Sequence, residues 1–162
     1  MLLRMSLDPS EYFASLPKRR VGAGALLLDG AGSVLMVEPV YKEPWEIPGG
    51  IVEEGEAPRQ ACTRECLEEL GLRLKIGRLL VLEHQMQERP LGDSVMFVYD
   101  GGVVPDGTAL VLPPAELRSY RFIAPDRLGE FTDERLARRI RFALMALREG
   151  STVELTNGVC AD

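Results

Sequence analysis

The sequence is poor in cysteine and lacks long apolar runs. Its three cysteines are an odd number without C-x-x-C spacing, which excludes a disulfide framework and favours a reducing, cytoplasmic location. No apolar run approaches the roughly 18 residues that a membrane-spanning helix needs. The first twenty residues also lack the apolar core and the small-residue cleavage site of a secretory signal. We therefore expect neither a membrane partner nor secretion.

Basic residues are the minority among the charged side chains. Lysine and arginine number 19 against 25 aspartates and glutamates, which gives a net charge of −6 and a pI near 5.0. This balance argues against nucleic-acid binding, which depends on neutralising phosphates. It leaves room for a small phosphorylated ligand whose charge is met by a bound metal. A chain of 162 residues with 46% apolar residues suits one globular domain.

Glutamates are concentrated between Gly50 and Leu72, in GIVEEGEAPRQACTRECLEELGL. Pro58 suits the first turn of a helix and Gly71 suits its left-handed end, so a helix is predicted over residues 57–70. On this helix Glu65, Glu68 and Glu69 share one face, where like charges cost a few tenths of a kcal/mol per pair. The cluster is either an ordinary solvated face or a site for a hard divalent cation bound by oxygen ligands.

The residues flanking the glutamates favour the metal site. The stretch fits the pattern G-x5-E-x7-R-E-U-x-E-E-x-G-U, where U is a bulky apolar residue, through Gly50, Glu56, Arg64, Glu65, Cys66, Glu68, Glu69, Gly71 and Leu72. Ordinary residue frequencies would produce its seven specified positions in fewer than about one window in 10⁸. The stretch resembles the Nudix box of the Nudix hydrolase family, in its MutT-like form. Cys66 stands where the family usually has a larger apolar residue, and it packs as a small hydrophobe.

The resemblance implies a fold and a metal site. The fold is the Nudix α/β/α sandwich, a mixed β-sheet flanked by helices, covering about residues 20–148. The equivalent glutamates of the family bind Mg²⁺ or Mn²⁺ with a backbone carbonyl, which assigns Glu65, Glu68, Glu69 and the C=O of Gly50 to metal. Mg²⁺ would activate water, neutralise charge on a diphosphate and align nucleophile and leaving group.

Further site residues are expected outside these ligands. Arg64 is expected to orient the glutamates, while Glu56 braces the loop. The base that accepts the proton of the attacking water varies among family members. Glu116, which precedes an apparent strand at 120–123, is either that base or a surface glutamate. Trp45 and Tyr41 are candidate substrate contacts, with core packing as the alternative for Trp45.

The remaining elements follow from apolar patterning. A hairpin is predicted over residues 21–37, with strands at 45–50, 79–82, 94–99 and 116–123, the strand at 94–99 ending at Asp100-Gly101-Gly102. A second helix is predicted over residues 132–148, with a solvated arginine face formed by Arg135, Arg138, Arg139 and Arg141. Cys62 and Cys66 are expected to point inward from the first helix.

Three segments are expected in the chain. They are an N-terminal extension (1–19), the Nudix hydrolase domain (20–150) and a C-terminal tail that forms a strand or hairpin (151–162).

The predicted function is a Mg²⁺-dependent pyrophosphohydrolase. Its substrate would be a nucleoside diphosphate linked to another moiety, with a nucleoside triphosphate or a nucleotide sugar favoured. A non-catalytic nucleotide-sensing module is the main alternative, but such modules usually lose box residues and every charged position is present here. A diphosphate isomerase on the same scaffold is the least favoured alternative. The sequence does not determine the oligomeric state, and the resemblance allows a homodimer.

Overall fold

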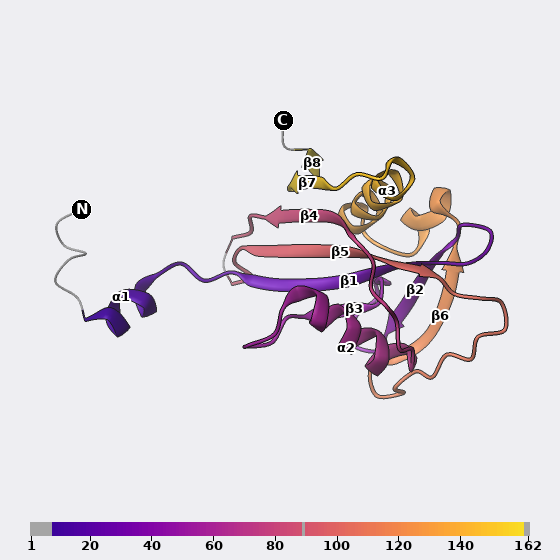
Figure 1. Ribbon diagram of the computed structural model, residues 1–162, viewed down its shortest axis with the longest axis horizontal. Coiled ribbons are helices and arrows are strands. Elements are labelled where there is room, and N and C mark those ends of the chain that lie inside the picture. Colours follow the sequence, from indigo (N-terminus) through magenta and orange to yellow (C-terminus); the bar gives the residue numbers. More distant parts are fainter. Residues whose placement is uncertain (1–7, 89, 161–162) are drawn as a thin grey trace.

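The computed structural model describes residues 8–88 and 90–160. Within them an eight-stranded sheet runs in the order β6-β2-β1-β5-β4-β7-β8, and β3 pairs with β1 beside this path (Figure 1). The strands are β1 (Arg20–Leu28), β2 (Val34–Pro39), β3 (Gly49–Ile51), β4 (Leu79–Gln85), β5 (Ser94–Val103), β6 (Leu117–Ile123), β7 (Val153–Thr156) and β8 (Val159–Cys160). The sheet is mixed, because β1–β5 and β4–β7 are parallel and the other pairs are antiparallel.

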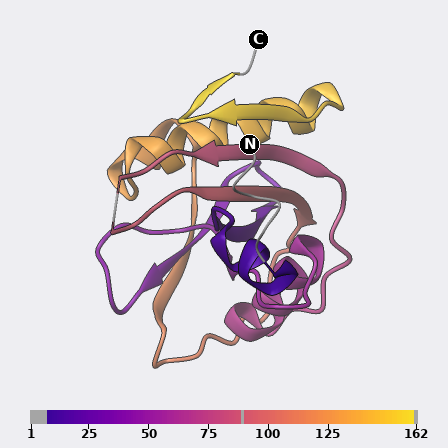
Figure 2. The ribbon, with the colours of Figure 1, turned by 90° about the vertical axis from the view of Figure 1, so that its left-hand side faces the viewer.

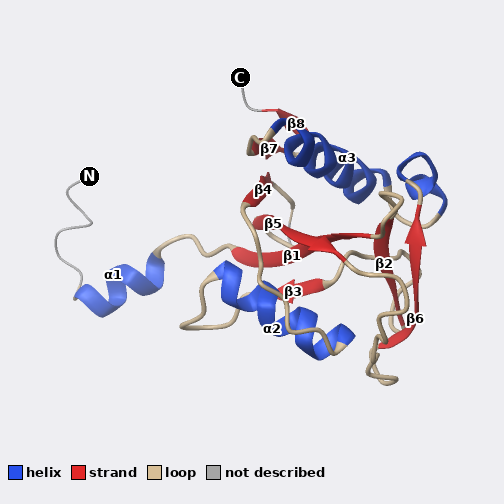
Figure 3. Ribbon diagram, turned by 45° about the vertical axis from the view of Figure 1, so that its right-hand side comes forward, coloured by secondary structure: helices blue, strands red, loops and turns tan. Residues whose placement is uncertain are grey.

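Helices cover both faces of the sheet, as Figure 3 shows for α2 (Pro58–Leu70) and α3 (Glu134–Glu149). A short 3₁₀ helix, η2 (Pro125–Glu130), leads into α3. Each face has its own apolar core: Cys62, Cys66 and Leu70 of α2 lie in one, and Ile140 and Ala143 of α3 lie in the other. The predicted mixed sheet flanked by helices is confirmed, and so are the inward cysteines.

The short helix α1 (Pro9–Ser15) precedes the sheet and buries none of its residues. It projects away from the body of the molecule at the indigo end of the ribbon (Figures 1 and 2). Residues 1–7 of the predicted N-terminal extension lie outside the described residues. No helix in the described part of the chain is long and apolar enough to cross a membrane.

Helix α2 begins and ends as its sequence indicates. Pro58 occupies the first turn, and the side chain of Gln60 accepts a hydrogen bond from the N–H of Ala57 (2.9 Å). Gly71 ends the helix with φ 70°, a left-handed conformation that glycine adopts without a Cβ clash. The predicted helix over 57–70 therefore differs from the observed one by a single residue.

The predicted strand over residues 45–50 is wrong in its position. Glu46 makes only an isolated bridge with Val37, and the strand proper is β3, where Gly49 to Ile51 pair with Gly24 to Gly22. Pro48 has no N–H to donate but its C=O accepts a hydrogen bond from Ala25 (2.9 Å). The chain therefore joins the sheet at the two glycines and not at the residues before them.

The predicted hairpin over residues 21–37 forms only at its turn. β1 and β2 pair at the single position Leu28–Val34, and β2 then pairs along its length with β6. β3 takes the edge of β1 that a full hairpin would have used.

The strand predicted over 94–99 continues to Val103. The register shifts where Asp100 pairs with Leu26 and Gly102 pairs with Leu27, so the glycines form a bulge within the strand and do not end it. A β-carbon at Gly101 would lie 2.7 Å from Leu27 Cδ2, which explains the glycine in this packed position.

Two features complete the C-terminal half. β7 and β8 form a hairpin around Asn157 (φ 50°) and Gly158 (φ 79°), a turn that Asn-Gly favours. The predicted solvated arginine face is wrong for one of its members. Arg139 is buried and forms an ion pair with Glu83 of β4, whereas Arg138 and Arg141 are exposed.

Candidate active site

Arg64 lies at the centre of a hydrogen-bond network around the predicted metal ligands. Its Nε and Nη2 donate to the two carboxylate oxygens of Glu56, both at 3.0 Å, in a bidentate pair. Its Nη1 donates to Glu65 (2.8 Å) and Glu68 (3.0 Å), and Nη2 also donates to the C=O of Ile51 (3.1 Å). One planar guanidinium thus joins the loop, β3 and two glutamates of α2, a task that suits its fork of donors.

Two glycines let the glutamates approach the backbone of β3. The Glu65 carboxylate occupies the position that a β-carbon of residue 50 would take. At Gly49, where φ is 153°, a β-carbon would collide with the backbone of β1. The N–H of Gly49 donates to Glu69 Oε2 (2.9 Å). Glu65 and Glu69 are therefore held against adjacent peptide units of the Gly49-Gly50 pair.

Burial and mutual repulsion raise the pKa values of these carboxyls. Burial raises the pKa of Glu69 to about 7, and the hydrogen bond from Gly49 offsets part of this while the charges of Glu65, Glu46 and Glu116 add to it. Burial also raises the pKa of Glu65, partly offset by Arg64. Glu56 behaves oppositely, because its hydrogen bonds with Arg64 lower its pKa. Arg64 therefore neutralises Glu56 while Glu69 is left short of positive charge.

The raised pKa of Glu69 predicts how stability depends on pH. Between about pH 4.5 and 7 the folded protein retains a proton on Glu69 that the unfolded chain has released, so stability falls as pH rises through this window. The loss from this group approaches about 3 kcal/mol once pH exceeds 7. We expect Glu69→Gln to weaken this dependence, measured by urea unfolding in chelator between pH 5 and 8. An unchanged pH slope in the variant would contradict the assignment, and Glu54→Gln, in the exposed loop, is the control.

The residues present fit a divalent cation. Among residues 8–88 and 90–160 no three His, Cys, Asp or Glu side chains are already close enough to hold a metal ion. However, Glu65 and Glu69 are oxygen donors held against Gly50 and Gly49, and their pKa values are raised first by burial and then by neighbouring negative charge. Carboxylate and carbonyl oxygens are the donors that hard dications prefer. Glu68 is more peripheral, since its side chain is 56% exposed and pairs with Arg64.

Glu116 lies near enough to contribute to the electrostatics of this cluster. Its backbone C=O accepts from Val40 (2.8 Å), which ties the loop before β6 to the end of β2. Its charge raises the pKa of Glu65, Glu69 and Tyr41. Glu116 therefore lies close enough to the box glutamates to affect their charge states. Its side chain is exposed.

A cavity of about 530 Å³ adjoins the glutamates. Gly49 and Gly50 line it, together with Trp45 and Tyr41, the two residues predicted to contact substrate. Trp45 is also restrained by its neighbours, since its ring packs edge-on against Phe131 (centroids 5.5 Å apart) and Arg121 lies 5.8 Å from its centroid. Trp45 therefore packs against its neighbours and also forms part of the cavity wall. Its contact with substrate stays a prediction.

Sequence reasoning missed several residues of this cavity. Glu46 lines it, forms an ion pair with Lys42 and raises the pKa of Glu69. Thr132 and Arg139 approach it from the start of α3. Only the position of Glu46 within the segment before the box could have indicated its role. The contribution of α3 depends on how the helix crosses the sheet, which no local pattern encodes.

Comparison with known proteins supports the same class. A family model described as NUDIX domain matches residues 18–144. The "Putative 8-oxo-dGTP diphosphatase" of Bacillus subtilis (strain 168) is 28% identical over 114 residues, 68% of this chain and 70% of that protein. The "RNA pyrophosphohydrolase" of Actinobacillus succinogenes is 38% identical over 61 residues, 38% of this chain and 31% of that protein. The crystal structure of a MutT protein from Methanosarcina mazei Go1 matches with a TM-score of 0.66 at 25% identity, covering 84% of this chain and 99% of that one.

The fold is a mixed sheet between two helices, with glutamates gathered around one arginine. The family match and the named relatives identify the chain as a hydrolase that acts on phosphorus-containing anhydrides. The chain belongs to the Nudix family. The predicted family and enzyme class are thereby confirmed.

Proposed function

We propose that the chain is a Mg²⁺-dependent pyrophosphohydrolase that cleaves the diphosphate bridge of a nucleoside diphosphate linked to another moiety. A nucleoside triphosphate or a nucleotide sugar is the favoured substrate. The observation that carries the proposal is the placement of Glu65 and Glu69 against Gly50 and Gly49, which also line a cavity large enough for a nucleotide. The relatives are named as a putative 8-oxo-dGTP diphosphatase and an RNA pyrophosphohydrolase, which supports a phosphoanhydride substrate.

The side chains of the site divide the work of hydrolysis. Glu65, Glu68, Glu69 and the C=O of Gly50 would hold the metal, which when bound supplies positive charge against the diphosphate and polarises water. Arg64 is a positioning residue, because its guanidinium holds Glu65 and Glu68 relative to β3. Trp45 and Tyr41 would contact the rest of the substrate from the cavity wall.

Water would attack one phosphorus of the bridge, forming a P–O bond as the bridging P–O bond breaks. The products are a nucleoside monophosphate and either pyrophosphate, from a nucleoside triphosphate, or a phosphorylated fragment, from a nucleotide sugar. Glu116 is our candidate to accept the proton of the attacking water, since its exposed carboxylate shares the field of Glu65 and Glu69. Glu69, whose pKa of about 7 is suited to proton transfer near neutral pH, is the alternative base.

A substrate panel tests the proposal directly. Nucleoside triphosphates and nucleotide sugars are incubated with Mg²⁺ or with excess EDTA, and released phosphate and nucleoside monophosphate are measured. We expect turnover of at least one compound with Mg²⁺ and a loss of more than about a hundredfold in EDTA. Full turnover in chelator would contradict the metal-dependent mechanism, and binding without turnover would favour the nucleotide-sensing alternative.

A further inference from the structure

The part of the cavity between the sheet and α3 is lined by both apolar and polar side chains. Gly22 and Gly24 of β1 line it, and added β-carbons there would lie 2.6 Å from Met96 Cε and 3.0 Å from Ile47 Cδ1. Met96 also lines the cavity, as does Leu136 of α3 on the opposite side. A side chain at either glycine would displace Met96 or Ile47, which pack directly against this backbone. The apolar groups of this wall can contact a nucleotide base.

One buried cation borders this part of the cavity. Arg139 of α3 lines the cavity, and its Nε donates to Glu83 Oε2 of β4. Their side chains are 8% and 0% exposed, so the pair has lost most of its hydration. A buried pair of this kind is often no more stabilising than two apolar side chains of similar volume. Stability alone therefore gives little reason for an arginine at this position.

The geometry leaves the rest of the guanidinium available. Its Nη nitrogens have no hydrogen-bond partner among residues 8–88 and 90–160. Glu83 fixes the direction of Arg139 through Nε, while Glu83 Oε1 is buried without a partner of its own. Glu83 is therefore a positioning residue, and Arg139 is the group that faces the cavity.

A second, independent observation concerns Thr132, just before α3. Thr132 precedes α3 by two residues and lines the cavity, and its hydroxyl is buried without a hydrogen-bond partner. A buried polar atom without a partner costs free energy unless a ligand or water satisfies it. Thr132, just before α3, lines the same cavity as Leu136 and Arg139 within the helix. Few polar groups in an apolar pocket are the usual means by which a protein orients a ligand.

We propose that Arg139, held by Glu83, makes this enzyme prefer a base that presents a ring carbonyl over one that presents an amino group at the same position. The inference rests on the proposed nucleotide substrate and names its class. A guanidinium only donates hydrogen bonds, so a carbonyl oxygen satisfies it and an exocyclic amine does not. A second anion is disfavoured at Arg139 itself, because Glu83 already neutralises this guanidinium.

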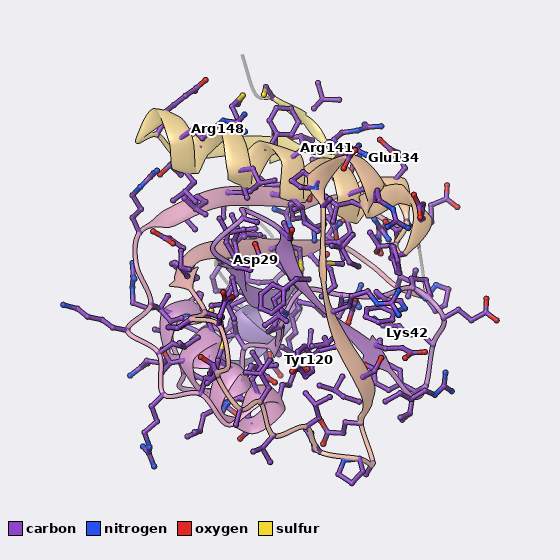
Figure 4. All side chains as sticks on the ribbon, turned by 90° about the vertical axis from the view of Figure 1, so that its right-hand side faces the viewer. Asp29, Lys42, Tyr120, Glu134, Arg141 and Arg148 are labelled. Atoms are coloured by element: carbon purple, nitrogen blue, oxygen red, sulfur yellow. The ribbon has the colours of Figure 1, made fainter. Side chains whose placement is uncertain are left out.

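Paired substrates that differ at this one group provide the test. ITP and ATP share the purine ring but carry a carbonyl or an amine, and UTP and CTP form the same pair for pyrimidines. The wild-type protein is compared with Glu83→Leu/Arg139→Met, which replaces the ion pair by apolar side chains so that no buried charge remains. The matched control is Arg141→Met, since Arg141 lies on the outer side of α3 beside Glu134 (Figure 4), with Nη1 3.2 Å from its carboxylate.

We expect wild type to favour the carbonyl member of at least one pair by about tenfold to a hundredfold in kcat/KM. The double variant should lose this ratio because kcat/KM falls more for the carbonyl substrate than for the amino substrate, while its melting temperature is retained. Arg141→Met should keep the ratio. Equal use of both members by wild type, or an unchanged ratio in the double variant, would overturn the inference while leaving the pyrophosphohydrolase proposal intact.

A binding measurement tests the role of Arg139 independently of the proposed hydrolysis. Titration calorimetry of ITP and ATP in EDTA measures base preference without turnover. A preference for ITP that the double variant loses would support the role of Arg139 even if no nucleotide were hydrolysed, in which case only the proposed function would fail. Equal metal-free affinity of wild type for both nucleotides, together with equal turnover, would contradict the role of Arg139.

Discussion

Glu69→Gln is expected to lower kcat at least about a hundredfold while making the metal-free protein more stable at pH 8. The fall in kcat would follow from removing a proposed metal ligand, and the gain in stability from the burial that raises the pKa of this carboxyl to about 7. The ionised side chain is costly to keep in the folded state, and glutamine can still accept the hydrogen bond from the N–H of Gly49. Steady-state hydrolysis with Mg²⁺ and urea unfolding in EDTA measure the two effects.

The opposite signs distinguish a functional carboxylate from a structural one. A structural glutamate would lose stability and activity together, and that result would remove Glu69 from the proposed metal site. Glu116→Gln provides a further comparison, because a base that is not a ligand should lower kcat without reducing the stabilisation that Mg²⁺ gives. Glu54→Gln, an exposed change four residues beyond Gly50, should alter neither quantity.

Arg64→Lys is expected to reduce both stability and activity despite keeping the positive charge. A lysine cannot reproduce the bidentate pair with Glu56 or reach Glu65, Glu68 and Ile51 at once. Loss of several partly buried, charge-assisted hydrogen bonds should cost about 2–4 kcal/mol. Because the glutamates would no longer be oriented, kcat should fall together with the apparent affinity for Mg²⁺.

Urea unfolding with and without Mg²⁺, combined with Mg²⁺ titration of activity, measures these losses. Arg73→Lys, at an exposed position just beyond α2, is the matched control and should behave as wild type. If Arg64→Lys kept full activity at saturating Mg²⁺ and full stability in EDTA, the network around Arg64 would not organise the site.

The sequence predicted the box helix most accurately because its limits are local. Pro58 and Gly71 act through their own backbone geometry, and the spacing of Glu65, Glu68 and Glu69 follows from the helical repeat. The resemblance of nine box positions to the Nudix pattern then indicated the sheet and its flanking helices, which no single element could have specified.

What the sequence could not predict depends on tertiary pairing. The apolar run of β1 does not reveal that β3 pairs at Gly22 to Gly24 while β2 pairs only at Leu28. Arg139 looks like its exposed neighbours on a helical projection, and only the crossing of α3 over β4 brings it to Glu83. The roles of Glu65, Glu68, Glu69 and Glu116 in metal binding and catalysis stay predictions that the variants above test.

The pairing of β1 with both β3 and β5 ties the backbone of the site to the centre of the sheet. Because the same central strand pairs with β3 at one end and with β5 along its length, the peptide units beside Glu65 and Glu69 cannot separate without breaking ladder hydrogen bonds. Local breathing would open the outer loops long before it disturbed these two glycines. The backbone proposed to bind the metal should therefore keep its conformation during catalysis.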